Sequence, residues 1–291
     1  MIAVLLALAS AVCFGAMSVA VRSGLRAHPE PDTAAVATTF FALLVAVAAA
    51  LVERGGGELA HPEELAVFAL AGLLAPGVSQ IFLTLAIRDV GASRTSVAVG
   101  SAPLFTATLA ILILDEPFEW PLALGATLIV GAGIILAAET VRPAHFRLVG
   151  VAFALTATIL FSVRDLLVRW YSEDAVLGSV EAAVAAFAAG LLVIVGYSAA
   201  VRGNALGAAL TSPRLIRFAP AGVFFGLSYV LLFEAYYRGK VTVVSPLVAT
   251  ESLWGVLLAA LVLRRSELVG PRLVLGAGLV VVGGVLISAF R

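Results

Sequence analysis

Five ionisable side chains lie inside long apolar stretches in the second half of the sequence. They are Arg164, Asp165, Glu181, Glu234 and Glu251. A charged group at the centre of a membrane helix costs about 2.5–3.5 kcal/mol on insertion scales, so such groups usually pair or mark a pathway for ions and substrates. Glu251 is the most informative of the five, because it lies near the middle of its apolar stretch and the others lie closer to an end.

Glu251 is interpreted as a substrate contact that also binds and releases a proton. Burial among apolar groups favours the neutral form of a carboxyl group, which suits it to exchange a proton during transport. Arg164 has two interpretations, as an anchor for a substrate carboxylate or as one member of a structural ion pair. Because Asp165 points about 100° away from Arg164 on a helix, we expect Glu181 or Glu234 to be the partner in such a pair. Glu234 has an equally simple interpretation as an interfacial residue.

A second set of candidate substrate contacts is polar or aromatic: Ser79, Gln80, Ser228, Tyr229 and Trp254. The first two occupy positions in the third apolar stretch that match those of Ser228 and Tyr229 in the eighth. In one interpretation they donate hydrogen bonds to a substrate, and in the other they let helices approach closely. Trp254 lies three residues after Glu251 and shares its helix face, so it packs over a substrate or against lipid and core.

The elements that must position these residues are membrane helices. The chain of 291 residues is 62% hydrophobic and 12% charged, about half the charge of a typical soluble domain. Lys+Arg and Asp+Glu balance at 18 each, and no basic patch is present, which excludes a nucleic-acid partner. The single cysteine, Cys13, excludes a disulfide framework, and we expect no metal and no cofactor.

Ten apolar stretches are long enough to cross a bilayer as helices. They cover residues 2–21, 33–51, 65–86, 92–114, 121–138, 148–170, 175–200, 215–237, 241–263 and 273–290. Their apolar residues run continuously, which favours helices over the alternating strands of a membrane barrel. The sequence therefore predicts an all-α, multi-pass integral protein of the cell membrane.

The two halves of the sequence resemble each other. Residues 77–86 match 226–235, residues 101–114 match 250–263, and residues 124–126 match 275–277. Each copy has five predicted helices, and because five is odd, the second copy must enter the membrane from the opposite face. Such inverted repeats are common in secondary transporters, which bind substrate near the midplane. We expect ten transmembrane helices in two five-helix inverted-topology repeats, over residues 1–140 and 146–291.

Both copies also resemble the EamA module of the drug/metabolite transporter superfamily. The first carries Ala86, Gly91, Ala102-Pro103-Leu104, Leu114-Asp115-Glu116, Leu124-Gly125-Ala126 and Gly131/Gly133; the second carries Ala235, Gly239, Glu251-Ser252-Leu253, Glu267, Gly276 and Gly283/Gly284. The second copy departs from the pattern at Ser252, where a proline is usual. The resemblance implies a gradient-driven carrier, commonly an exporter of amino acids, related metabolites or drugs, with both termini cytoplasmic. The distribution of loop arginines favours both termini outside, so the orientation stays open.

The sequence thus predicts a secondary active transporter and not an enzyme. It would export small metabolites by alternating access around a midplane cavity, with proton coupling through Glu251. The expected partners are a small-molecule substrate and membrane lipids, and a homodimer is possible on this interpretation. One alternative is a lipid or glycolipid flippase of the same fold, which a lateral apolar opening between helices would favour. A weaker alternative is an intramembrane lipid-processing enzyme with Glu181 or Asp165 as its base.

Overall fold

The computed structural model describes residues 1–54, 62–114, 120–137, 146–172, 177–203, 213–239, 244 and 247–289. Within these ranges all regular structure is helical and no strand occurs, which confirms the predicted fold class at this level. Six helical stretches are long and apolar enough to cross a membrane: Ile2–Ala27, Pro31–Glu53, Leu65–Val90, Val149–Ser172, Ser179–Arg202 and Arg214–Arg238. Trp120–Leu136, Glu251–Val262 and Pro271–Ile287 are shorter apolar helices. The motif residues Asp115 and Glu116 lie outside the described residues.

The helices of the first half are α1 (Ile2–Ala27), α2 (Pro31–Arg54), α3 (Pro62–Gly72), α4 (Ser79–Val90), α5 (Ala92–Val99), α6 (Ala102–Leu114) and α7 (Trp120–Ala137). Those of the second half are α8 (Val149–Ser172), α9 (Ser179–Arg202), α11 (Ala219–Arg238), α13 (Glu251–Val262) and α14 (Pro271–Ala289), with short 3-10 segments η3 (Pro213–Phe218) and η4 (Arg264–Ser266). At a rise of about 1.5 Å per residue, the 26 residues of α1 exceed the roughly 30 Å hydrocarbon core of a bilayer.

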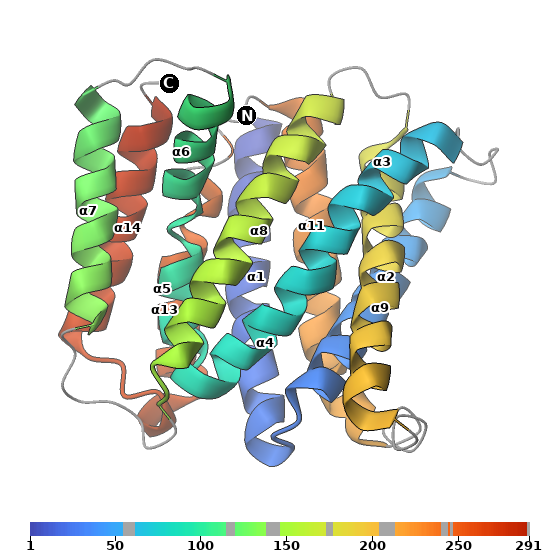
Figure 1. Ribbon diagram of the computed structural model, residues 1–291, viewed down its shortest axis with the longest axis horizontal. Coiled ribbons are helices and arrows are strands. Elements are labelled where there is room, and N and C mark those ends of the chain that lie inside the picture. The colour runs from blue at the N-terminus through green and yellow to red at the C-terminus, as the bar shows by residue number, and fades with distance from the viewer. Residues whose placement is uncertain are drawn as a thin grey trace.

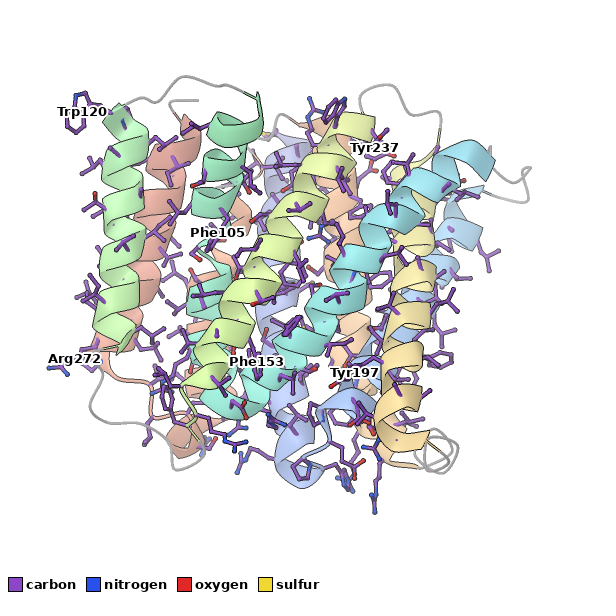
Figure 2. All side chains as sticks on the ribbon, viewed as in Figure 1. Phe105, Trp120, Phe153, Tyr197, Tyr237 and Arg272 are labelled. Atoms are coloured by element: carbon purple, nitrogen blue, oxygen red, sulfur yellow. The ribbon has the colours of Figure 1, made fainter. Side chains whose placement is uncertain are left out.

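Helices α1 and α11 pack against each other in the middle of the bundle (Figure 1). Helices α2, α9 and the α3–α4 pair lie on one flank, and α7 packs along α14 on the other. The α5–α6 pair and α13 lie between these groups. Helix α1 begins and α14 ends at the same end of the bundle. Trp120 marks this end on α7, and Arg272 marks the opposite end (Figure 2).

Among the described residues, turns interrupt the predicted stretches 65–86 and 92–114, and a further turn at residues 249–250 lies in the stretch 241–263. A π-type turn, η1 (Leu73–Val78), separates α3 from α4; inside it Ala75 is extended, with φ −144° and ψ 115°, and Pro76 lacks the N–H that a continuous helix needs. A second turn at Gly100 and Ser101 separates α5 from α6. Irregular backbone of this kind is tolerated at membrane depth where it is buried in protein or lines a cavity.

Helices α7 and α14 cross closely at two motif glycines. A Cβ atom on Gly125 would lie 2.5 Å from the carbonyl oxygen of Gly283, and one on Gly283 would lie 2.7 Å from that of Gly125. Small residues at these two positions therefore permit the crossing. For Gly131 and Gly133, on the same helix, no heavy atom of the described residues lies within 4 Å of a Cβ placed on them, so no such packing role is seen in the described part of the chain.

Candidate functional site

A small cavity lies between the two halves of the chain and is called here the central cavity. The first half contributes Ser10 and Phe14 from α1, Val99 from α5 and Ala102 from α6. The second half contributes Phe161, Arg164 and Asp165 from α8, Ser228, Tyr229 and Leu232 from α11, and Val248 and Glu251. Its volume is about 30 Å³, enough for about one or two water molecules. A metabolite would therefore need the helices to separate before it could enter.

Arg164 is the buried cation of this cavity, with 3% of its surface exposed. Its Nε lies 2.8 Å from Oδ1 of Asp165, but the angle is outside hydrogen-bond geometry. Among the described residues, Nε and Nη1 of Arg164 have no hydrogen-bond acceptor. The N–H donors of a buried guanidinium normally have hydrogen-bond acceptors. The two donors of Arg164 without an acceptor can therefore bind an anionic group.

Aromatic rings surround the guanidinium of Arg164. Its Cζ lies 4.5 Å from the ring centroid of Tyr229, 5.4 Å from that of Phe161 and 5.9 Å from that of Phe233. A cation within about 6 Å of an aromatic face is attracted by the ring quadrupole, which offsets part of the cost of burying Arg164. Phe225, Tyr229 and Phe233 follow each other at four-residue spacing on α11, and this spacing was a signal in the sequence that could have identified the aromatic face.

Glu251 is the first residue of α13 and is 5% exposed. Its carboxyl group interacts electrostatically with both Arg164 and Asp165. The three ionisable groups therefore act as one cluster on the wall of the central cavity. With one guanidinium and two carboxyl groups, the cluster is neutral when one carboxyl group is protonated and carries one net negative charge when neither is protonated.

Of the predicted polar contacts, Ser228 and Tyr229 reach the central cavity. Ser228 is already engaged: Ser10 Oγ donates to its carbonyl oxygen at 2.8 Å, and the two hydroxyl oxygens are 3.1 Å apart. This contact joins α1 to α11 across the halves. Tyr229 is 1% exposed, and its hydroxyl has no hydrogen-bond partner in the described part of the chain.

The other predicted contacts do not line the central cavity. Glu234 accepts hydrogen bonds from Arg238 and Ser179 near the end of α11, an arrangement that agrees with its interfacial interpretation. Glu181 lies in the first turn of α9. Trp254 packs against Gly15 of α1.

Ser79 and Gln80 begin α4 directly after the η1 turn, and both are buried. Both polar atoms of the Gln80 amide and the hydroxyl of Ser79 have no hydrogen-bond partner among the residues the structure describes. They form a polar position next to a break in a membrane helix, separate from the charged cluster.

Comparison with known proteins identifies the first half. The sequence profile of the EamA-like transporter family matches residues 1–138. Residues 1–138 are thus similar to an EamA-like transporter module, a family of the drug/metabolite transporter superfamily. This match and the apolar helices support a multi-pass integral membrane protein.

The structural comparison covers the whole chain. A solved crystal structure, described only as that of a protein, aligns over 99% of this chain and 99% of its own, with a TM-score of 0.62 and 16% sequence identity. At this identity the likeness concerns the fold alone. No curated protein matches the chain.

The expected partner of Arg164 was wrong. Arg164 pairs with its neighbour Asp165, and not with Glu181 or Glu234. The direction of the Cβ atoms differs by about 100°, but the long side chain of arginine bends back far enough to bring its Nε beside the adjacent carboxylate.

A second buried cluster lies where α1, α5 and the turn before α14 meet. Gly91 and Glu267 are residues of the EamA-like pattern, but their spacing does not predict that they meet. Glu267 is 0% exposed and accepts from Arg22 Nε at 3.0 Å, from Ser93 Oγ at 2.8 Å and from Ser93 N at 3.2 Å. Arg94 Nη1 donates to the carbonyl oxygen of Glu267 at 2.9 Å. Gly91, at φ 90°, leaves room for this carboxylate, because a Cβ there would lie 2.4 Å from Glu267 Oε2.

Within the described ranges, no group of three or more His, Cys, Asp or Glu side chains is arranged to hold a metal ion.

Proposed function

We propose that the protein is a ten-helix secondary transporter of small metabolites, built from two five-helix modules of opposite orientation over residues 1–140 and 146–291. The EamA-like match over residues 1–138 supports the first module. A turn at residues 100–101 and another at residues 249–250 fall at corresponding positions of the matched stretches 101–114 and 250–263. This shared interruption supports the assignment of residues 146–291 as a second copy.

Transport would proceed by alternating access to the central cavity. Residues of both halves form its wall, so a rocking of one module against the other would open the cavity to one face and then to the other. The small volume supports the interpretation of this structure as an occluded conformation. The direction of transport would be export, as is common in the superfamily.

The observation that carries the proposal is the buried Arg164 with unsatisfied donors beside a cavity. We assign Arg164 the role of anchor for an anionic group of the substrate, most simply a carboxylate, because a guanidinium binds carboxylates with two parallel hydrogen bonds. Asp165 would hold the guanidinium in place while the cavity is empty. The hydroxyl groups of Ser228 and Tyr229 would form hydrogen bonds with the substrate once the helices separate.

Glu251 would carry the coupling proton. In the occluded cluster its carboxyl group competes with Asp165 for the charge of Arg164. An anionic substrate bound to Arg164 would add a negative charge to the cluster. Protonation of Glu251 would neutralise one carboxylate and so reduce the repulsion between the negative charges. This competition links substrate binding to proton binding, which is the requirement for coupled transport.

Glu181 and Glu234 would line the approach to the cavity from the end of the bundle where α9 begins and α11 ends. Ser79, Gln80 and Trp254 would act on helix packing or on later steps of the cycle, since they lie away from the charged cluster in this conformation.

The experiment is transport by the purified protein in liposomes. Labelled amino acids, organic acids and cationic drugs would be tested with an imposed proton gradient, with and without a protonophore. We expect accumulation of compounds that carry a carboxylate, loss of accumulation with the protonophore, and loss of transport in Arg164→Gln. Vectorial transport that is unchanged in Arg164→Gln would overturn the assignment of Arg164.

A further inference from the structure

A buried tyrosine, Tyr236 of α11, contacts the charged cluster of the central cavity without lining the cavity itself. It is 1% exposed, and its hydroxyl donates a hydrogen bond to the carboxylate of Asp165. Tyr229 lies seven residues earlier on α11 and covers the guanidinium of Arg164 with its ring. Residues seven apart share one face of a helix, so one face of α11 contacts both members of the Arg164–Asp165 pair.

A second contact between α8 and α11 fixes the position of Tyr236. Arg169 Nη1 donates to the carbonyl oxygen of Tyr236 at 3.4 Å. Arg169 lies four residues after Asp165 on α8, and residues at this spacing are neighbours on the helix surface. Neighbouring side chains of α8 thus hold Tyr236 by its backbone and by its hydroxyl.

The two carboxyl groups of the cluster have unequal partners. Asp165 Oδ1 lies 2.8 Å from Arg164 Nε, and the same carboxylate accepts from Tyr236. Glu251 interacts with Asp165 and Arg164 through charge, with no hydrogen bond from the described residues. A nearby cation and a hydrogen-bond donor both favour the ionised form of a carboxyl group. Asp165 is therefore the better carboxylate, and Glu251 the better site for the single proton of the neutral cluster.

The titratable groups of the described residues that face Asp165 agree with this order. They are Arg164 on α8, Tyr229 and Tyr236 on α11, and Glu251 on α13. The tyrosine phenols carry no charge near neutral pH. Glu251 disfavours a negative charge on Asp165 only while it is itself ionised, so a proton on Glu251 also stabilises the Asp165 carboxylate.

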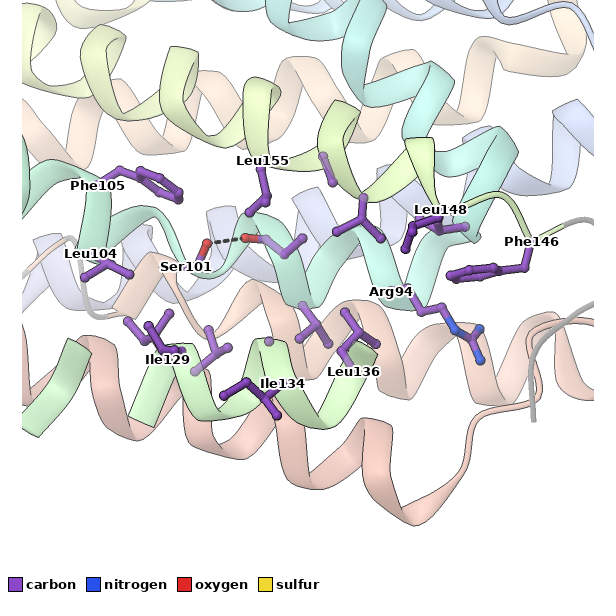
Figure 3. Close-up of a pocket in the computed structure, with 18 residues that line it drawn as sticks. Arg94, Ser101, Leu104, Phe105, Ile129, Ile134, Leu136, Phe146, Leu148 and Leu155 are labelled. Atoms are coloured by element: carbon purple, nitrogen blue, oxygen red, sulfur yellow. Dashed lines mark hydrogen bonds between the residues drawn. The ribbon is translucent and has the colours of Figure 1, made fainter. Parts of the chain in front are cut away.

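A larger cavity also borders α8, but away from the charged cluster. It has a volume of about 400 Å³ and is lined from α8 by Val151, Ala154 and Leu155, which belong to the first half of that helix (Figure 3). The larger cavity and the central cavity share no lining residue. The groups that line the larger cavity therefore do not enter the balance between Asp165 and Glu251.

We propose that Tyr236 is a positioning residue that keeps Asp165 ionised and so assigns the exchangeable proton of the cluster to Glu251. The proposal builds on the proposed function, in which Glu251 carries the coupling proton. Without the Tyr236 hydroxyl, the two carboxyl groups would compete for the proton on more equal terms. A protonated Asp165 would no longer hold the guanidinium of Arg164 by charge, and proton binding would be less tightly linked to substrate binding.

Infrared spectroscopy of the protein in lipid membranes tests this assignment, because a protonated carboxyl group absorbs apart from a carboxylate. The signal is the difference between wild type and Glu251→Gln at neutral pH. Carbon-13 in the side-chain carboxyl groups of glutamate, or of aspartate, shifts the absorption of that residue type. We expect the protonated-carboxyl band of the wild type to shift with the glutamate label and not with the aspartate label. No band, or a band that shifts with the aspartate label, would overturn the proposal.

Tyr236→Phe tests the role of the hydroxyl while keeping the ring. The ratio of protonated aspartate to protonated glutamate should rise by about tenfold to a hundredfold, the effect of one hydrogen bond to a charged group. Tyr237→Phe is the matched control, since the adjacent ring packs against Phe68 of α3. An unchanged ratio in Tyr236→Phe, or equal changes in the two variants, would overturn the role of Tyr236.

The infrared result is independent of transport, so the two proposals can fail separately. If Glu251→Gln transports like the wild type while the labels behave as expected, the proposed function fails and the role of Tyr236 stands. If Glu251→Gln loses gradient-driven accumulation while Tyr236→Phe keeps the wild-type ratio, the role of Tyr236 fails and the proposed function stands.

Discussion

Arg22 and Glu267, 245 positions apart in the chain, form a buried ion pair in which Arg22 Nε lies 3.0 Å from Glu267 Oε1. The pair joins α1 to the turn before α14. Ser93, at the start of α5, donates both its backbone N–H and its hydroxyl to the same carboxylate. Three segments that are distant in sequence are thus held together by one acidic side chain.

Glu267→Gln should therefore destabilise the protein. The substitution removes the charged acceptor of Arg22, and breaking one partner of a buried ion pair costs about 3–5 kcal/mol. In detergent, the melting temperature of Glu267→Gln should fall by several degrees. The exposed carboxylate of Glu53 offers a matched control, because a surface Glu→Gln change usually alters stability by about 0.5 kcal/mol or less. Equal melting temperatures for the two variants would show that the pair adds nothing to stability.

Gly222→Ala should destabilise the crossing of α2 and α11. A Cβ atom at Gly222 would lie 2.3 Å from Phe41 Cβ and 2.7 Å from the carbonyl oxygen of Thr38, and overpacking of this kind costs about 1–3 kcal/mol. Gly278→Ala on α14 is the control, since its Cβ would meet nothing within 4 Å. Thermal unfolding should separate the two variants, and a Gly222→Ala protein as stable as Gly278→Ala would mean that the two helices do not approach this closely.

Tyr229→Phe should separate the role of the ring from the role of the hydroxyl. The variant keeps the aromatic face over Arg164 and removes a hydroxyl that is buried without a partner among the described residues. Its melting temperature should be unchanged or raised, because burial of an unsatisfied hydroxyl costs about 1–3 kcal/mol.

The same variant reports on substrate binding. If the Tyr229 hydroxyl bonds to the substrate, KM should rise by up to about tenfold, the value of one neutral hydrogen bond. Tyr229→Leu, which also removes the ring, should lower both stability and transport, since a buried cation–π contact contributes up to about 2 kcal/mol. An unchanged KM in Tyr229→Phe would remove the hydroxyl from the binding site.

The apolar pattern predicted where helices lie better than where they break. The stretch predicted at 33–51 is helix α2, Pro31–Arg54, because its Ala, Val and Leu run contains no interruption. Pro76 signalled the break between α3 and α4, since it removes a backbone donor. Pro103 is a comparable signal for the break between α5 and α6, since it lies in the first turn of α6. The packing of that break was not predictable from spacing: a Cβ at Gly100 would meet Ser252 and Val280.

The same distinction applies to the charged residues. Position inside an apolar stretch identified five ionisable residues, and three of them, Arg164, Asp165 and Glu251, line the central cavity. Spacing did not distinguish these three from Glu181 and Glu234, which do not line it. The ion pair of Arg22 with Glu267 was not predictable in this way, because both residues lie near the ends of their stretches and their contact spans most of the chain. Local spacing describes one helix at a time, and these partners belong to separate segments, α1 and the turn before α14.

Proton-driven transport by Glu251→Gln in liposomes tests most directly whether the buried cluster is the transport site. The measurement compares wild type, Glu251→Gln and the control Glu53→Gln, at acidic and at alkaline pH, with and without an imposed proton gradient. We predict that Glu251→Gln loses gradient-driven accumulation and the pH dependence of transport, keeps substrate exchange between the two sides, and melts no lower than the control. Accumulation by Glu251→Gln with the gradient and pH dependence of the wild type would contradict a role for Glu251 in proton coupling.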